Sequence, residues 1–575
     1  MRSNQEVAAV FRNIADAMEL LGEDRFKQQA YRRVADAIQA LPLSVADYYA
    51  RGALREIPGV GQAIAAKVQQ FIEIGQIDLY ERLKAQVPEG VLLVMHVPGV
   101  GPKTAMRLYR ELGIVDLAGL QTAAATGQIS SLKGLGKKLE VAILAGLQER
   151  PAEAPRWLLG EMLPLANDLL AAFRAADRTI SLGSIAGSLR RAAPVVNDID
   201  LVLCAADPGA TLERLLRLPQ IATVEERTAT SATVTLHTTC GCHILVTTTE
   251  QWGAALVMWT GNGAHRTALQ RRAQARGMRL EADGVWQGST RLPTTSEAGV
   301  YHLLDLPLIP PELREGWGEI EAAEAGRLPH LVEASDIQAD MHMHTAWSDG
   351  TGTIAERAET CIARGYHYAV ITDHSAYMGM VQGLDAARLR AQRVEIDAVN
   401  AELQRRGTDF HLLQGSEVDI LPDGSLALPD DVLASLDWVV ASLHVSLKQE
   451  REVVTARLLQ AIYNPHVDCI GHPTGRLLLK RAGADLDMEA VLEAAAETGT
   501  VLEIDGAYER LDLDAEVVKR AVDRGIKLAI DSDAHADGDL DGLRYGVLTA
   551  RRGWASASDI VNSWDWEQVR LIQKA

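Results

Sequence analysis

The sequence predicts a multidomain protein with an all-α front part, a mixed α and β middle part and a repeating βα domain at the back. Three observations predict this order. Apolar residues recur at helical spacing through residues 1–150, strand-like and helical segments alternate through residues 157–300, and apolar β-rich segments alternate with helices from residue 339 onward. The 575 residues suffice for roughly three or four domains of ordinary size.

The overall composition is that of a globular protein, with 47% hydrophobic and 23% charged residues. No apolar run reaches the roughly 18 residues of a membrane span, and the first residues lack the apolar core of a secretory signal. The five cysteines form no pairing motif, which is typical of reduced thiols. We therefore expect a cytoplasmic protein that makes no membrane contact. We also expect a monomer.

The net charge of −20 is unevenly distributed along the chain. Residues 1–150 carry 18 Lys and Arg against 16 Asp and Glu, whereas residues 331–575 carry 23 against 41. The acidic surplus therefore lies in the last part of the chain, as metal-binding chemistry would require. The nearly neutral front part can still present a basic face to a polyanion.

A short motif occurs three times in the front part, at Ile57–Val68, Val97–Leu108 and Leu132–Ile143. Each copy is an apolar residue, a Gly-x-Gly turn and the start of a new helix. The glycines allow a tight turn and leave amide N–H groups at the helix start, where they can bind an anion. One copy alone is equally explained as a plain turn between helices, but three copies favour phosphate binding without sequence readout. Because the three copies resemble helix-hairpin-helix DNA-binding motifs, the predicted DNA contacts are Gly59, Gly61, Gly99, Gly101, Gly134 and Gly136.

The sharpest motif of the middle part is GSLRRAAPVVNDIDLVL, at residues 187–203. Asp198 and Asp200 lie two residues apart on a predicted strand, so both carboxylates face the same side. Such a pair can bridge two divalent cations for phosphoryl transfer, whereas two surface acids on a strand are the ordinary alternative. The turn before the strand offers N–H groups, a hydroxyl and two cations to nucleotide phosphates. These predicted nucleotide-binding residues are Gly187, Ser188, Arg190 and Arg191.

In the last part, apolar strand segments repeatedly end in a histidine or an acidic residue, as in DMHMHT, AVITDHS and VVASLHV. In a parallel barrel such strand ends converge at one face. The predicted metal ligands are His342, His344, Asp349, His374, Glu417, His444, His472, Asp533 and His535. Asp340 lies on the same strand face as the first two, and Glu503 and Asp505 are candidate supporting groups. We expect His367, His411 and His466, outside these motifs, to be ordinary core or surface residues.

In this order the motifs resemble those of bacterial family X DNA polymerases: helix-hairpin-helix DNA-binding motifs, a nucleotidyltransferase palm and a PHP phosphoesterase domain. The segment WGAALVMWTGNGAH resembles the family's stretch near the sugar of the incoming nucleotide, which adds Thr260 and Gly261 to the nucleotide-binding set. The resemblance implies this organisation: residues 1–87 a helical lyase-like domain with the first hairpin, 88–150 helix-hairpin-helix fingers, 151–250 the palm, 251–315 a thumb-like subdomain, 316–337 a linker and 338–575 a (β/α)₇ PHP barrel.

The front part also resembles the small lyase domain of this family. Lys67 matches the lysine that forms a Schiff base, and Lys27, Tyr31 and Arg32 match residues around a 5′-phosphate pocket. Ala63 stands where family members often carry a lysine, and a single helical lysine is more often a solvated charge. Lyase activity at Lys67 is therefore a hypothesis that the residues support only in part.

One catalytic position of the palm departs from the family pattern. Where the family has a third aspartate on a neighbouring strand this sequence has His243, and the arginine two residues later is Leu245. A neutral imidazole can ligate a metal, but it adds no negative charge and prefers softer ions than Mg²⁺. Two interpretations stay open: His243 is a third ligand, or it is only a strand residue and no third ligand exists.

The resemblance implies a DNA-repair enzyme that combines a gap-filling polymerase, weak or Mn²⁺-dependent because of His243, with a 3′–5′ exonuclease. It implies Mn²⁺ or Mg²⁺ at the palm and two or three Zn²⁺ or Mn²⁺ ions in the barrel, acting on gapped, nicked or 3′-recessed DNA and dNTP at the nucleoid. Two alternatives remain, namely a DNA-end nuclease with an inactive palm and a phosphate monoesterase for small molecules.

Overall fold

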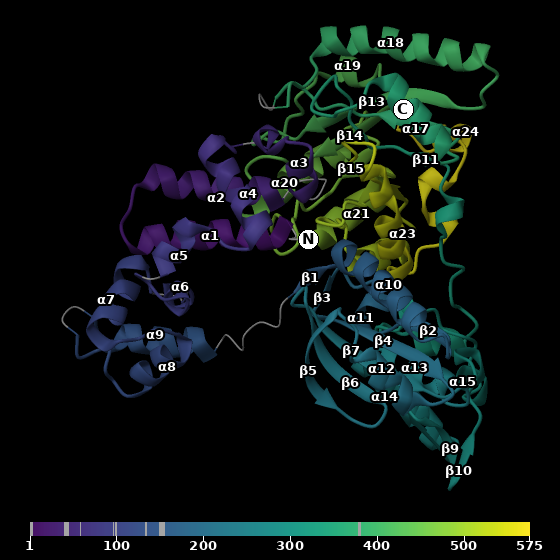
Figure 1. Cartoon of the computed structure of the whole chain (residues 1–575). Coiled ribbons are helices and arrows are strands. Elements are labelled where there is room, and N and C mark those ends of the chain that lie inside the picture. Colours follow the sequence, from purple (N-terminus) through teal and green to yellow (C-terminus); the bar gives the residue numbers. More distant parts are fainter. Residues whose placement is uncertain are drawn as a thin grey trace. The chain divides into compact units, whose positions relative to one another are not determined.

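The computed structural model describes residues 4–574, apart from 40–44, 58, 85, 96, 98–99, 133–134, 149–155 and 378–380. It divides the chain into two compact units, Met1–Ala154 and Pro155–Ala575 (Figure 1). Each unit contains hydrophobic core of its own. Over the described ranges, no helix combines the length and apolar character needed to cross a membrane.

The first unit contains only helices in its described residues, which confirms the predicted all-α front part. Val7, Phe11 and Ile14 of the first helix pack with Val34 and Ile38 of the second in one buried core, and the three- and four-residue spacing on each helix accounts for this shared face. The helices are α1 Asn4–Leu20, α2 Arg25–Gln39, α3 Val45–Ala50, α4 Gln62–Ile74, α5 Asp78–Lys84, α6 Glu89–Met95, α7 Pro102–Leu112, α8 Leu117–Ala125 and α9 Lys137–Gln148, with a 3₁₀ turn η1 at Leu54–Glu56.

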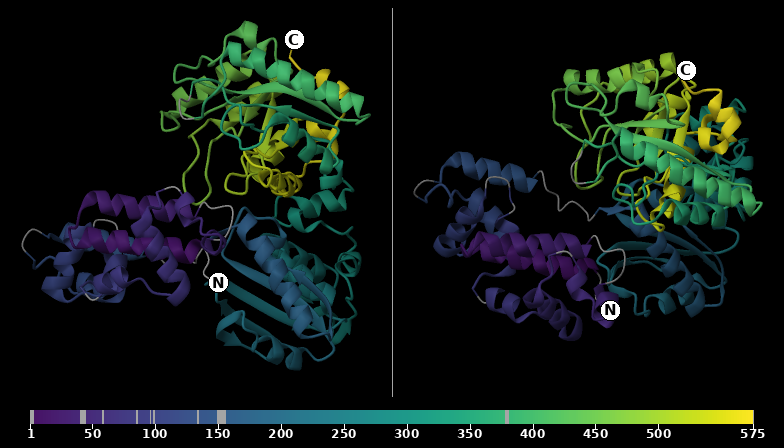
Figure 2. Two further views of the ribbon diagram at one scale, coloured as in Figure 1. Left: turned by 45° about the horizontal axis from the view of Figure 1, so that its top comes forward. Right: turned by 90° about the horizontal axis from the view of Figure 1, so that it is seen from above.

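The second unit begins with a five-stranded sheet in the order β2-β4-β7-β6-β5 (Figure 1, Figure 2). Its central pair, β4 and β7, is parallel and the other pairs are antiparallel. The strands are β2 Ile180–Ile185, β4 Asp198–Ala205, β5 Ile221–Arg227, β6 Ser231–Leu236 and β7 Gly241–Thr247, and a small ribbon joins β1 Trp157–Leu158 to β3 Val195–Val196. The helices packed around the sheet are α10 Leu159–Ala176, α11 Gly187–Arg190, α12 Pro208–Leu215 and α13 Trp252–Thr260.

The alternation of side chains along β4 separates the two faces of this sheet. Ile199, Leu201 and Leu203 belong to the core that α10 and α12 cover. Val202 and Cys204 belong to a second apolar cluster that α13 covers. Because side chains two residues apart share a face, Asp198 and Asp200 lie on the α13 face of the strand. The sheet therefore presents both carboxylates toward the part of the chain that follows it.

After α13 the chain forms a small subdomain with its own apolar core. It comprises α14 Gly263–Ala275, the antiparallel strands β8 Met278–Glu281, β9 Gly284–Gln287 and β10 Thr290–Leu292, and the helices α15 Glu297–Leu303, η2 Pro311–Leu313 and α16 Glu319–Glu324. The segment predicted as a linker is partly built into this core, since Ala323 and Leu331 are buried there.

The last part is a parallel barrel whose seven strands follow one another in chain order, which confirms the predicted (β/α)₇ fold. An isolated parallel bridge between Met343 and Ala534 joins the two ends of the sheet. The strands are β11 Ala339–Asp340, β12 Tyr368–Ile371, β13 His411–Asp419, β14 Trp438–Ser442, β15 Cys469–Gly471, β16 Val501–Asp505 and β17 Leu528–Asp531. The helices are α17 Ile354–Ala363, α18 Ala386–Arg405, α19 Asp430–Leu433, α20 Arg451–Tyr463, α21 Met488–Thr498, α22 Ala515–Val522, α23 Leu543–Arg552 and α24 Trp566–Arg570.

The sheet domain packs directly against the barrel within the second unit. Leu511 and Tyr545 of the barrel belong to the same apolar core as α10 and the five-stranded sheet. At Gly160 the approach is so close that a Cβ atom would lie 2.2 Å from Cγ of Tyr508. The Tyr545 hydroxyl donates to the Gly160 carbonyl over 3.3 Å. The barrel and the sheet domain are therefore joined by apolar packing rather than by the chain connection alone.

Candidate functional site

The described residues of the three helical hairpins in the first unit share one backbone hydrogen bond. In each turn an N–H donates to the carbonyl three residues earlier, and Gly61 and Gly101 have the same backbone angles, φ −79° and ψ 173°. Gly59 adopts a positive φ of 80°, a conformation that favours glycine. Gly136 is exposed, as Gly61 and Gly101 are, whereas Gly99 and Gly134 lie outside the described residues. The repeated geometry indicates that the three copies are the same motif.

The residues predicted for lyase chemistry do not form a connected group. Lys67 on α4 donates to the Ala63 carbonyl over 3.0 Å, and burial, followed by the charge of Arg82, lowers the pKa of its amine. Arg32 pairs with Asp16 and Glu19, while Tyr31 is buried against Phe11 and Lys27 is exposed. In the described part of the chain, no hydrogen bond or ion pair joins Lys67 to these three residues. Its lowered pKa favours a nucleophilic amine, and the rest of the lyase hypothesis stays a prediction.

The two palm carboxylates meet His243 on the sheet. Asp200 on β4 pairs in register with His243 on β7, and His243 Nδ1 lies 3.0 Å from Asp200 Oδ1 and 3.9 Å from Asp198 Oδ2. The hydrogen bond to Asp200 raises the pKa of His243, and burial, together with the charge of Asp200, raises the pKa of Asp198. One ligand atom from each residue lies within 4.8 Å of the others, so the group has the geometry to hold a divalent cation.

A cavity of about 470 Å³ opens in front of these residues. Gly187 in its wall has a φ of +59°, and a Cβ there would lie 1.8 Å from Asp200 Oδ2, so only glycine fits this position. Ser188, Arg191 and Gly261 from the predicted nucleotide set also line the cavity. The wall further contains residues that the sequence reasoning did not single out, namely Trp259, Asn262, Gly263 and Arg266.

Two of the side chains predicted to bind the nucleotide, those of Arg190 and Thr260, form contacts within the protein instead. Both terminal nitrogens of Arg190 donate to the Glu297 carboxylate, over 2.9 and 2.6 Å, and Nη1 also donates to the Thr260 hydroxyl over 2.9 Å. The Thr260 side chain is fully buried. Arg190 and Thr260 therefore join the sheet domain to the following subdomain, and Arg191 is the member of the arginine pair that faces the cavity.

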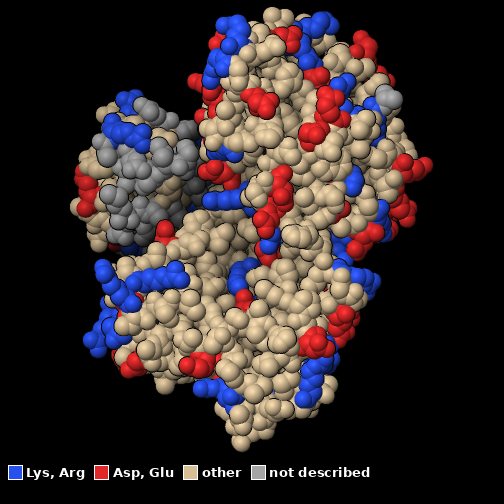
Figure 3. All heavy atoms as spheres, turned by 90° about the vertical axis from the view of Figure 1, so that its right-hand side faces the viewer, with Lys and Arg blue, Asp and Glu red and all other residues tan. Residues whose placement is uncertain are grey.

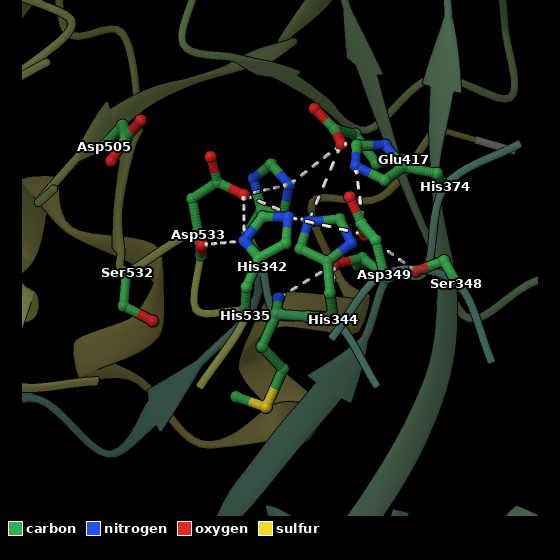
Figure 4. A network of polar contacts seen from close by, with 12 residues as sticks. His342, His344, Ser348, Asp349, His374, Glu417, Asp505, Ser532, Asp533 and His535 are labelled. Atoms are coloured by element: carbon green, nitrogen blue, oxygen red, sulfur yellow. Dashed lines mark hydrogen bonds and ion pairs between the residues drawn. The ribbon is translucent and has the colours of Figure 1, made fainter. Parts of the chain in front are cut away.

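The predicted ligands of the barrel converge at the carboxyl ends of its strands (Figure 4). Eight of them form three overlapping groups that can each hold a metal ion: His344, Asp349, His374 and His535; His342, His344, Glu417 and Asp533; and His374, Glu417 and His444. His472, the ninth, places Nε2 2.9 Å from Glu417 Oε1. The buried Glu417 carboxylate is common to two groups and lies near the centre of the cluster.

Outer residues hold several of these imidazoles in orientation. The Nδ1 atoms of His342 and His444 lie 2.6 Å from Glu503 Oε1 and 2.9 Å from Asp419 Oδ1. These contacts aim the Nε2 atoms inward, as in metal sites where a second group fixes the tautomer. Glu503 was singled out from the sequence, whereas Asp419 was not, although it lies two residues beyond Glu417 on the same strand face.

Several buried polar atoms of the cluster lack a hydrogen-bond partner within the described structure, including His342 Nε2, His344 Nδ1 and His472 Nδ1. An unpaired buried polar atom is costly, and divalent cations coordinated by imidazole and carboxylate groups would satisfy part of this set. Burial alone would raise the pKa of Glu417, but the neighbouring histidines hold it well below its usual value. The donor set therefore fits bound divalent cations.

An arginine that the sequence reasoning missed borders the cluster. Arg510 lies in the loop after β16, and its Nε is 3.3 Å from Asp505 Oδ2 and 3.8 Å from Asp533 Oδ2. Asp533 itself has a φ of 51°, a strained conformation for a residue other than glycine. No periodic signal marks a single arginine in a loop, so only the structure places Arg510 beside the predicted ligands.

Four family models match the chain: a helix-hairpin-helix domain at residues 2–77, a SAM-like helix-hairpin-helix tandem at 91–149, the DNA polymerase beta thumb at 255–315 and the PHP domain at 340–537. Two further relatives each match less than two fifths of the chain. A probable phosphatase of Thermoanaerobacter sp. (strain X514) is 32% identical over 39% of this chain and 89% of its own. A probable phosphatase of Caldicellulosiruptor saccharolyticus is 30% identical over a stretch that covers 36% of this chain and 82% of its own.

One relative matches from end to end. The DNA polymerase/3'-5' exonuclease PolX of Bacillus subtilis (strain 168) is 37% identical over 574 residues, which is 99% of each chain. The hairpins, the sheet with its paired aspartates and the histidine-rich barrel occur in the order that this match and the four family models require. The chain therefore belongs to the PolX family, the bacterial family X DNA polymerases that carry a C-terminal PHP domain.

Proposed function

We propose that this chain is a DNA-repair enzyme that fills short gaps at the palm and trims 3′ ends at the barrel. The observation that carries the proposal is the presence of two separate clusters of carboxylate and imidazole ligands in one compact unit. Each cluster has the composition that phosphoryl-transfer chemistry with divalent cations requires. The end-to-end similarity to a polymerase and exonuclease supports assigning one activity to each cluster.

The barrel site acts as the 3′–5′ exonuclease. Its nine ligands hold two or three Zn²⁺ or Mn²⁺ ions, because mixed imidazole and carboxylate donors suit these ions better than Mg²⁺. The cations supply Lewis-acid activation of water and of the scissile phosphodiester. Glu503 and Asp419 keep the coordinating imidazoles in place, and Arg510 adds a fixed positive charge on the side of Asp533, where it attracts the substrate phosphate.

The palm site acts as the polymerase. Asp198 and Asp200 bind Mn²⁺ or Mg²⁺, and Ser188 and Arg191 bind the phosphates of a dNTP in the adjoining cavity. His243 lies where it reaches both carboxylates, which favours its role as a third ligand over that of an ordinary strand residue. An imidazole in place of a carboxylate leaves the site one negative charge short, so the polymerase prefers Mn²⁺.

A phosphate monoesterase for small molecules is the less supported alternative. The probable phosphatases match less than two fifths of this chain, whereas the PolX relative matches 99% of it. A small substrate would leave the three hairpins and the nucleotide cavity without a role. A nuclease with an inactive palm is also less supported, because both aspartates and the cavity beside them are present.

The first unit makes most of the contacts with DNA. The substrate is gapped, nicked or 3′-recessed DNA of the nucleoid, and the protein acts as a monomer. The hairpin amides bind phosphates without reading sequence. On the face drawn in Figure 3 the acidic and basic side chains of the described residues are interspersed.

Loss of one barrel ligand should abolish trimming. His344→Ala or His374→Ala is expected to slow 3′ trimming of labelled DNA by more than about 100-fold, because each change opens the metal cluster. His411→Ala, an exposed histidine outside the cluster, is the matched control and should trim normally. The double change Asp198→Ala/Asp200→Ala should stop nucleotide insertion and leave trimming intact. Loss of trimming in this palm variant would show that the nuclease is not confined to the barrel.

Restoring a third carboxylate should change the metal preference of the palm. His243→Asp adds a negative charge beside Asp200 and should raise Mg²⁺-supported insertion into gapped DNA by roughly tenfold. His237→Asp adds the same charge at an exposed turn and serves as the control. Insertion rates are measured with Mg²⁺ and with Mn²⁺ on a primer protected from trimming. An unchanged Mg²⁺ rate in folded His243→Asp protein would contradict the role given to this position.

Removing the first unit should weaken DNA binding and its salt dependence. A chain of residues 155–575 should bind gapped DNA less tightly, and the slope of log affinity against log salt should become shallower by about 0.9 for each phosphate that the protein no longer neutralises. Fluorescence anisotropy over a range of salt concentrations measures both quantities. Equal affinity and slope for the full and shortened chains would refute the assignment of most DNA contacts to the first unit.

A further inference from the structure

Glu315 connects three segments of the second unit that lie far apart in the sequence. Its Oε1 accepts from Arg191 Nε over 3.0 Å, and it also accepts from Arg552 Nε and Nη2 over 3.0 and 2.8 Å. Asn262 Nδ2 donates to Glu315 Oε2 over 3.2 Å and to the Glu315 carbonyl over 2.7 Å. Arg191 and Asn262 line the nucleotide cavity, whereas Arg552 is the last residue of the barrel helix α23.

This connection is shielded from solvent. The side chains of Arg191, Glu315 and Arg552 are only 13%, 7% and 16% exposed. The Arg552 guanidinium also lies over the Trp317 ring, 5.3 Å from its centre. Ion pairs that are largely removed from water are screened less than surface pairs, so a change at one member is felt by the others.

The arrangement leaves Arg191 oriented toward the cavity. Its Nε is held by Glu315 and its Nη1 donates to the Thr260 carbonyl over 2.8 Å. Among the described residues, Arg191 Nη2 has no hydrogen-bond partner. This edge of the guanidinium is therefore available to bind an anion. Because two arginines share one carboxylate, the cluster carries a surplus positive charge beside the cavity. Without Arg552, that surplus would vanish, and the Glu315 carboxylate would keep only Arg191 and Asn262 as hydrogen-bond partners.

We propose that Arg552 is a positioning residue of the polymerase site: through Glu315 it orients Arg191 and maintains positive charge at the nucleotide cavity. Nucleotide binding by the palm thus depends on a side chain that the nuclease barrel supplies. The inference rests on the proposed polymerase function, since it concerns the cavity assigned to the incoming dNTP. The occupant that this charge favours is the triphosphate of a dNTP.

The test compares four full-length proteins: the unchanged chain, Arg552→Ala, Arg552→Lys and Arg551→Ala. Arg551 is the matched control, because it precedes Arg552 on α23 and pairs with Glu312 and the Val332 carbonyl. Arg551→Ala therefore removes one arginine from the same interface without touching the cavity. Calorimetry measures dATP binding with Mn²⁺, and single-nucleotide insertion gives KM and kcat on a primer protected from trimming.

Arg552→Ala should weaken dATP binding and raise KM by roughly three- to tenfold, with kcat changed less than about twofold, as expected for losing one partly buried charge interaction. Arg552→Lys should recover part of the loss, and Arg551→Ala should behave as the unchanged chain. In a Glu315→Gln background the Arg552→Ala change should have little further effect, because the connection is already broken. Trimming of 3′ ends should be equal in all of them.

The outcomes separate the two claims. An unchanged chain that neither binds nor inserts dATP would refute the proposed polymerase function. If it binds dATP and Arg552→Ala binds it equally tightly, the positioning role of Arg552 is wrong. Equal losses in Arg551→Ala and Arg552→Ala would likewise overturn it, because they would reflect a general loosening of the interface.

Discussion

The parallel order of the seven barrel strands is the constraint on which the nuclease site depends. Parallel strands place all their carboxyl ends at one face, so ligands that are almost two hundred residues apart along the chain meet there. This convergence buries the Glu417 carboxylate among imidazoles. Several nitrogen atoms of these imidazoles have no hydrogen-bond partner among the described residues. Divalent cations would balance these carboxylates and satisfy part of the unpaired atoms, which links the fold of the barrel to its proposed chemistry.

The palm site also combines carboxylates with an imidazole, but it brings them together through the alternation and register of two strands. Alternation along one strand aligns Asp198 and Asp200, and register with the neighbouring strand adds His243. The side chain at the third position sets the charge of the site, since a neutral imidazole adds no negative charge where a carboxylate would. Both sites lie in one compact unit, and the polar contacts around Glu315 show that the barrel and the nucleotide cavity share structural support. The two proposed sites are therefore distinct in their ligands and connected through their supporting residues.

Most of the fold and the composition of the metal site could be predicted from the sequence, because both follow from periodic patterns. Strand ends, helical spacing and repeated Gly-x-Gly turns each leave a regular signal. The residues that sequence reasoning missed act through pairings between distant segments. Arg190 resembles a phosphate ligand in the sequence but is held by Glu297, and neither Arg510 nor Arg552 belongs to a motif. Such pairings depend on packing, which no local pattern encodes.

Anomalous X-ray diffraction from crystals of the full-length protein grown with Mn²⁺, measured at the manganese and zinc edges, tests the central claim most directly. The account predicts two or three metal peaks among the barrel ligands around Glu417, and separate density between Asp198, Asp200 and His243. Absence of metal from the barrel cluster, or metal bound only at other residues, would contradict the assignment of the nuclease to this site. Metal in the barrel with none at the palm would limit the catalytic role to the barrel.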